Sequence, residues 1–97
     1  MSENQTLQFN QTIVRAPDVY ATTIDGDVVV FNVEKGQYYG MQEVGVRIWE
    51  LIEQPVAIGT LCDTLMDEFS VNRATCEAHV MTFIRDLREA QLIEVRD

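Results

Sequence analysis

The chain has 97 residues, 46% of them hydrophobic, and a formal net charge of −9. This length suits a single domain with a modest core and leaves little room for a deep catalytic cavity. Acidic residues are spread along the whole chain, which argues against nucleic acid and anionic membranes as partners and allows a basic peptide or protein.

Two extended stretches joined by a tight turn dominate the first half of the chain. Val19–Ile24 and Val28–Val33 are rich in β-branched and aromatic residues, and the Asp25-Gly26 pair between them suits a type I′ hairpin turn. Residues 1–10 are expected to form an N-terminal tail or a weak strand over Thr6–Asn10. Residues 11–97 are expected to form one domain.

A third strand is predicted at Gln37–Met41, after a turn over Glu34-Lys35-Gly36 in which Gly36 is free to take a positive φ. From Glu43 onward the apolar spacing changes from two towards three and four. Gln37–Met41 is therefore the last strand of its sheet in sequence, and we predict that it lies at the sheet edge. An edge strand has unpaired backbone groups that can receive a partner's backbone.

Three helices are predicted in the second half of the chain. Their ranges are about Glu43–Glu53, Ile58–Phe69 and Arg73–Ala90, with Asn72 as the N-cap of the third. Leu92–Val95 closes the chain as a short extended segment. Strands followed by helices with short connections predict an α+β fold, winged-helix-like, in which a small antiparallel three-stranded sheet precedes three helices.

The residues that could carry chemistry have simpler explanations. Cys62, Cys76 and His79 lack paired cysteine spacing and a clear fourth metal ligand, and Cys76 and His79 lack an orienting group for nucleophilic catalysis. Buried cysteines that behave as small hydrophobic residues explain the pattern better. We predict no metal, no cofactor and no enzymatic turnover.

A DNA-binding function is the alternative that a winged-helix shape raises. The predicted third helix should then be basic, but three arginines are balanced there by three acids: Arg73, Arg85 and Arg88 against Glu77, Asp86 and Glu89. A winged-helix transcription regulator or another protein-interaction module stays the alternative function.

A family resemblance is carried by a pattern of glycines and apolar residues between Ile13 and Val95. It comprises the run Gly36-Gln-Tyr-Tyr-Gly-Met-Gln-Glu-Val-Gly-Val-Arg-Ile-Trp-Glu-Leu-Ile52, then Pro55, Leu61, Leu65 and Phe69, and then Val80–Ile84, Leu87 and Leu92-Ile93. This pattern resembles the PqqD family, the peptide chaperones of pyrroloquinoline quinone synthesis, and the related precursor-peptide recognition elements, including those of lasso-peptide pathways. His79 is a departure, because the family often has an acidic residue there.

The resemblance implies that a leader peptide adds as a strand to Gln37–Met41 and lies against the third helix. On the strand it implies Gln37, Tyr38, Tyr39 and Met41 as binding residues. On the helix we expect Cys76, His79 and Phe83 to face the groove. Periodicity alone leaves the opposite flank, Glu77, Met81, Arg85 and Arg88, open as a rival.

The predicted function is that of a non-enzymatic adaptor. It binds the leader of a ribosomally made precursor peptide and presents it to a radical SAM enzyme or a leader peptidase. With no apolar run near the roughly 18 residues of a spanning helix, no expected signal peptide and no disulfide framework, we predict a cytoplasmic protein without nucleic-acid or membrane partners. It is expected to be a monomer or a homodimer.

Overall fold

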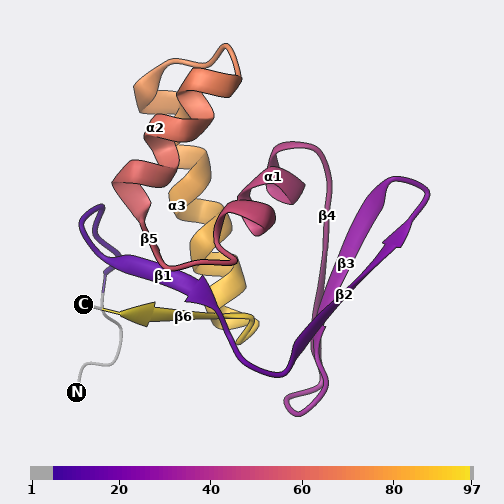
Figure 1. Ribbon diagram of the computed structural model, residues 1–97. Coiled ribbons are helices and arrows are strands. Elements are labelled where there is room, and N and C mark those ends of the chain that lie inside the picture. The colour runs from indigo at the N-terminus through magenta and orange to yellow at the C-terminus, as the bar shows by residue number, and fades with distance from the viewer. Residues whose placement is uncertain (1–5, 97) are drawn as a thin grey trace.

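The computed structural model describes residues 6–96 and has two small sheets and three helices (Figure 1). The elements in chain order are β1 (Thr12–Arg15), β2 (Val19–Ile24), β3 (Asp27–Asn32), β4 (Gln37–Met41), α1 (Val44–Leu51), β5 (Val56–Ala57), α2 (Ile58–Glu68), α3 (Arg73–Glu89) and β6 (Ile93–Arg96). The predicted α+β class is confirmed.

The antiparallel sheet β2-β3-β4 forms a wing that projects to one side of the helices (Figure 1). Asp25 and Gly26 both take positive φ, 52° and 87°, as the predicted type I′ turn requires. Gly36, with a φ of 69°, closes the turn into β4, where its N–H donates to the Asn32 carbonyl at 2.9 Å. β4 lies at the edge of this sheet, so the prediction from the change in apolar spacing is confirmed.

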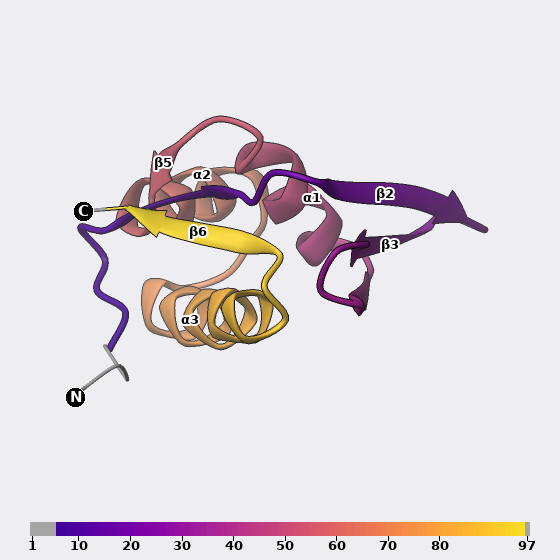
Figure 2. The same ribbon diagram turned by 90° about the horizontal axis from the view of Figure 1, so that it is seen from below.

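A second sheet, β5-β1-β6, was not predicted. Figure 2 shows β1 and β6 side by side, although they come from opposite ends of the chain. Residues 6–10 form no strand, contrary to the weak alternation there, but Leu7 is buried in the core. The wing is therefore attached to a body that both ends of the described chain help to build.

The three helices lie where they were predicted and end one or two residues earlier. Asn72 caps α3, since its side chain accepts a hydrogen bond from the Thr75 N–H at 2.8 Å. Helix α1 has no side-chain cap, and Glu43 before it takes a φ of 52°. This sharp entry turns the chain directly from β4 into α1.

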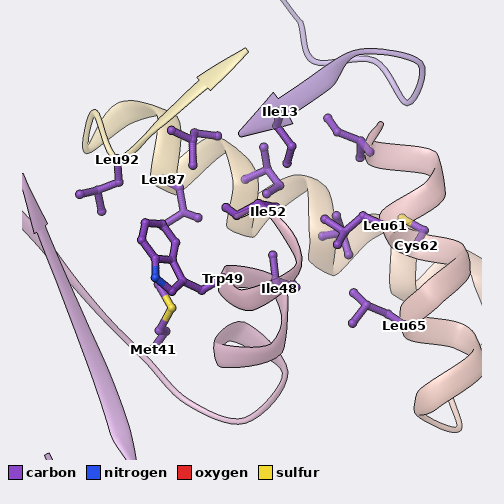
Figure 3. Close-up of a cluster of buried hydrophobic side chains, with 14 of the residues drawn as sticks. Ile13, Met41, Ile48, Trp49, Ile52, Leu61, Cys62, Leu65, Leu87 and Leu92 are labelled. Atoms are coloured by element: carbon purple, nitrogen blue, oxygen red, sulfur yellow. The ribbon is translucent and has the colours of Figure 1, made fainter. Parts of the chain in front are cut away.

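The core lies where the three helices meet the two sheets (Figure 3). Ile13, Ile52 and Leu87 are fully buried there, and Cys62 and Cys76 are buried beside them, as expected for small hydrophobic residues. The guanidinium of Arg15 lies 4.5 Å from the centroid of the Trp49 ring and donates to the Trp49 carbonyl. Within residues 6–96, no helix combines the length and apolar character that crossing a bilayer requires.

Candidate functional site

The free edge of β4 and helix α3 approach each other through one aromatic contact. Tyr39 points inward from β4, and its ring meets that of Phe83 edge-to-face, with 5.7 Å between the centroids. The Tyr39 hydroxyl donates to Asp86 Oδ2 at 3.4 Å. Burial, and secondarily the nearby Asp86 carboxylate, raises the pKa of Tyr39, so the phenol stays neutral at physiological pH.

A pocket of about 500 Å³ opens at this edge, and we call it the edge pocket. It is lined by Asp27, Val29, Tyr39, Gly40, Met41, Gln42, Gly45 and Phe83. Gln42 closes one end, because its Nε2 donates to Asp27 Oδ2 at 2.9 Å. The pocket therefore offers aromatic and apolar walls beside an unpaired strand.

A second pocket of about 230 Å³ lies between the three helices, and we call it the helix pocket. Its lining is almost wholly apolar: Val44, Gly45, Ile48, Leu65, Phe69, Val71, Cys76, His79, Val80 and Phe83. The exposed His79 is the one ionisable side chain in this lining apart from the thiol of Cys76. Gly45 and Phe83 line both pockets, so the two hollows adjoin.

Gly45 sets how closely Phe83 packs on α1. A Cβ at Gly45 would lie 3.2 Å from two ring atoms of Phe83 and 3.2 Å from Met41 Cβ. A side chain there would push the ring aside and reshape both pockets. The absence of a side chain at this helical position thus preserves the walls of the site.

The structure brings together five of the seven residues predicted for peptide binding. Tyr39, Met41 and Phe83 line the edge pocket, and Phe83, Cys76 and His79 line the helix pocket. Met41 and Cys76 are buried and contribute to the walls from within. Gln37 and Tyr38 are exposed on β4 and line neither pocket.

The rival flank of α3, formed by Glu77, Met81, Arg85 and Arg88, lines neither the edge pocket nor the helix pocket. Glu77 accepts a hydrogen bond from Arg73 at 2.8 Å, and Arg88 lines a separate hollow beside Asn32 and Glu94. Met81 packs partly buried against the core, and Arg85 is exposed. The flank beside β4 is the one that carries Phe83 and Asp86.

Sequence reasoning missed Gly40, Gly45, Asp86 and Asn32. Asn32 is buried, its Nδ2 donates to the Gln91 carbonyl at 2.8 Å, and its Oδ1 accepts from the Lys35 N–H at 3.0 Å. It thereby ties the wing to the turn after α3. A signal was available, because Asn32 continues the inward alternation of Val28 and Val30 and is the one polar residue in it.

The buried thiol of Cys62 lies outside the linings of both pockets. Burial raises the pKa of the Cys62 thiol to about 12, so this group is not a thiolate at neutral pH. Among residues 6–96, no group of three or more His, Cys, Asp or Glu side chains is placed to hold a metal ion. The site combines an unpaired strand edge with an apolar helix pocket and an edge pocket of mixed character, an arrangement that suits an extended peptide.

Comparisons with known proteins agree with this arrangement. The family model described as "Coenzyme PQQ synthesis protein D (PqqD)" matches residues 27–93. No curated protein gave a significant match. Among solved structures, "TbiB1 in Complex with the TbiA(beta) Leader Peptide" has 33% sequence identity and a TM-score of 0.74, and the match covers 84% of this chain and 94% of that one. "Lasso peptide synthetase B1 complexed with the leader peptide" has 16% identity and a TM-score of 0.72, covers 84% and 96% of the two chains, and shows the shared fold.

Proposed function

Since this chain belongs to the PqqD family, whose model matches residues 27–93, we propose that it is a non-catalytic adaptor for a ribosomally made precursor peptide. It binds the leader segment of that peptide and presents it to a modifying enzyme. The 33% identical neighbour, described as a complex with a leader peptide, supports this assignment.

The observation that carries the proposal is the free edge of β4 beside the edge pocket. The backbone N–H and C=O groups at the free edge of β4 have no partner strand in the sheet order β2-β3-β4. An extended peptide added there gains main-chain hydrogen bonds, which are independent of its sequence. The structure thus supplies a source of affinity that needs no particular side chain.

Sequence preference comes from side chains of the added strand. They alternate between the two faces, so every second one points to the side of Tyr39 and Phe83. The helix pocket is almost wholly apolar and favours apolar side chains, whereas the edge pocket has both apolar and polar walls, the polar ones from Asp27 and Gln42. We propose Gln37, Tyr38, Tyr39 and Met41 on β4, with Cys76, His79 and Phe83 on α3, as the peptide-binding residues.

The enzyme served is a leader peptidase of a lasso-type pathway or a radical SAM enzyme of a quinone-type pathway. The adaptor itself uses no metal or cofactor and acts as a monomer or a homodimer. Cys62 and Cys76 are free and buried, which fits a reducing compartment and a cytoplasmic location. The net charge of −9 and the neutral α3 disfavour the DNA-binding alternative.

A peptide-binding assay with paired proline variants tests the proposal. The probe is a fluorescein-labelled synthetic leader peptide, for which the TbiA(beta) leader bound by the 33% identical neighbour is the starting sequence. Adjacent N–H groups of a strand point to opposite edges, and proline has no N–H. Of Tyr38→Pro and Tyr39→Pro, one should destabilise the domain, and the other should stay folded and bind the leader about tenfold more weakly or worse.

A pair of phenylalanine variants controls for general loss of apolar surface. Phe83→Ala removes the wall shared by both pockets and should weaken leader binding by about tenfold or more. Phe9→Ala removes a similar, exposed ring from a residue whose backbone lies beside Gly59 at the start of α2, and it should bind as the wild type does. Leader affinity that survives both prolines and Phe83→Ala in folded protein would refute strand addition at β4.

A further inference from the structure

The edge pocket combines apolar walls with one carboxylate whose charge is not balanced. Asp27, half-buried at the start of β3, lines this pocket together with Val29, Met41 and Phe83. Its Oδ2 accepts a hydrogen bond from the neutral amide of Gln42 at 2.9 Å. The ion pairs of the described residues join Arg47, Arg73 and Arg96 to other carboxylates. Within residues 6–96, Asp27 is therefore left without a cationic partner.

We propose that the edge pocket binds a lysine side chain of the leader peptide and that Asp27 determines this specificity. The inference rests on the proposed function and deepens it, because it names a side chain that the leader carries. The apolar stem of the lysine lies across Gly40 and along Val29, and its ammonium donates to Asp27 Oδ1.

The strand register sets which leader position reaches Asp27. Val29 lies opposite Gly40, and Asp27 is two residues before Val29 on the same face of β3. A leader residue opposite Gly40 is thus two strand spacings across and two residues along from Asp27, about 12 Å between Cα atoms. An added Cβ at Gly40 would meet nothing within 4 Å, so the path across β4 is open. Among cationic residues, the long stems of lysine and arginine suit this distance.

The hydrogen bond from Gln42 favours lysine over arginine. Oδ2 of Asp27 is engaged by Gln42, and Oδ1 is the oxygen that faces a further donor. A guanidinium binds a carboxylate best through two parallel hydrogen bonds, one to each oxygen, whereas an ammonium is a compact charge with three rotatable donors. The Oε1 atom of the Gln42 amide is a second acceptor beside the carboxylate. The two side chains together therefore match one ammonium.

The charge around the pocket has one sign. Asp25 and Glu43 are close to Asp27 and Gln42 in the chain and are both acidic. The one base of residues 17–43, Lys35, follows the far end of β3 and lines a separate hollow. A cation bound at Asp27 is therefore attracted by its surroundings, and an anionic leader side chain is repelled.

The test measures how the full chain binds paired synthetic leaders. The TbiA(beta) leader is the starting sequence, and each position in turn carries lysine in one peptide and methionine in the other. Methionine is also unbranched but has no charge, so the ratio of the two Kd values isolates the contribution of the ammonium. The ionic strength is about 0.15 M, at which the Debye length is about 8 Å and long-range attraction is screened.

Two asparagine variants separate the pocket from general charge. Asp27→Asn removes the charge and keeps an oxygen that accepts from Gln42. The matched control, Asp25→Asn, removes the same charge from the adjacent hairpin turn, outside the pocket and at a positive φ that asparagine tolerates. We expect the wild type to prefer lysine by about tenfold or more at one leader position. Asp27→Asn should reduce this preference to about twofold or less, and Asp25→Asn should retain it.

The outcomes distinguish this inference from the proposed function. A wild type that binds the starting leader but prefers lysine at no position would overturn the inference and leave the proposed function intact. A lysine preference that survives Asp27→Asn, or that Asp25→Asn reduces equally, would also refute the role of Asp27. Tighter binding of arginine than of lysine at the preferred position would overturn the choice of lysine. A wild type that binds none of the peptides would refute the proposed function as well.

Discussion

Asn32→Ala tests whether one buried amide holds the wing against the helices. The substitution removes two hydrogen bonds, from Asn32 Nδ2 to the Gln91 carbonyl at 2.8 Å and from the Lys35 N–H to Asn32 Oδ1 at 3.0 Å. Each such bond contributes about 0.5–1.5 kcal/mol to the free energy of unfolding. Lys35 and Gln91 are exposed, so water can replace part of the loss. We therefore expect a loss of about 1–2 kcal/mol in total.

Denaturant unfolding measures this loss, and thermal unfolding should show a fall in Tm of about 4–8 °C per kcal/mol for a domain of this size. Gln37→Ala is the control for the unfolding measurements alone, since Gln37 is the exposed cross-strand neighbour of Asn32. Leader affinity should fall with Asn32→Ala too, because the loosened wing no longer fixes the distance between β4 and α3. An unfolding midpoint equal to that of the wild type would refute the assigned role of Asn32.

Three further predictions concern single positions. Gly40→Val should leave the free energy of unfolding unchanged or raise it by up to about 1 kcal/mol, because a Cβ at Gly40 meets nothing within 4 Å. A peptide titration should nevertheless show weaker leader binding, because the new side chain enters the edge pocket. Cys62, whose pKa burial raises to about 12, should resist a thiol-specific reagent at pH 8 in folded protein and react once the protein is unfolded; rapid labelling of native protein at Cys62 would contradict this. Hydrogen bonds from Arg47 hold the pKa of Glu68 below its usual value. The Glu68 carboxylate therefore stabilises the fold at a pH above its unfolded pKa, and this stabilisation is lost as the pH falls through the folded pKa. Glu68→Gln should lower the free energy of unfolding at pH 7, and a difference from the wild type that stays the same at pH 2 would contradict this role of Glu68.

The turns and helices were predictable because their signals are local. Asp25-Gly26 and Gly36 are residues that favour a positive φ, and the structure has it at all three. The change in apolar spacing after Met41 indicates the end of the β2-β3-β4 sheet. The sheet β5-β1-β6 was not predictable in the same way. The extended segment predicted at Leu92–Val95 is confirmed as β6, but the other two strands have only two and four residues, and the pairing of all three depends on distant segments rather than on a local pattern.

The site was predictable only in part for a similar reason. Helical periodicity gave α3 two candidate flanks, and the choice between them depends on where the wing sits relative to the helix. The contact of Tyr39 with Phe83, and the close approach of Gly45 to the same ring, join segments far apart in the sequence. Such contacts are set by tertiary packing, which apolar spacing in a single helix does not encode.

Hydrogen exchange at the amides of β4, measured by NMR with and without the synthetic leader, tests the central claim most directly. A strand added to β4 forms hydrogen bonds only with the N–H groups that point to the free edge. We predict that saturating leader slows exchange at alternate residues of Gln37–Met41, while the amides already bonded to β3 change little. Bound leader that leaves exchange along β4 unchanged would contradict strand addition and place the peptide elsewhere on the protein.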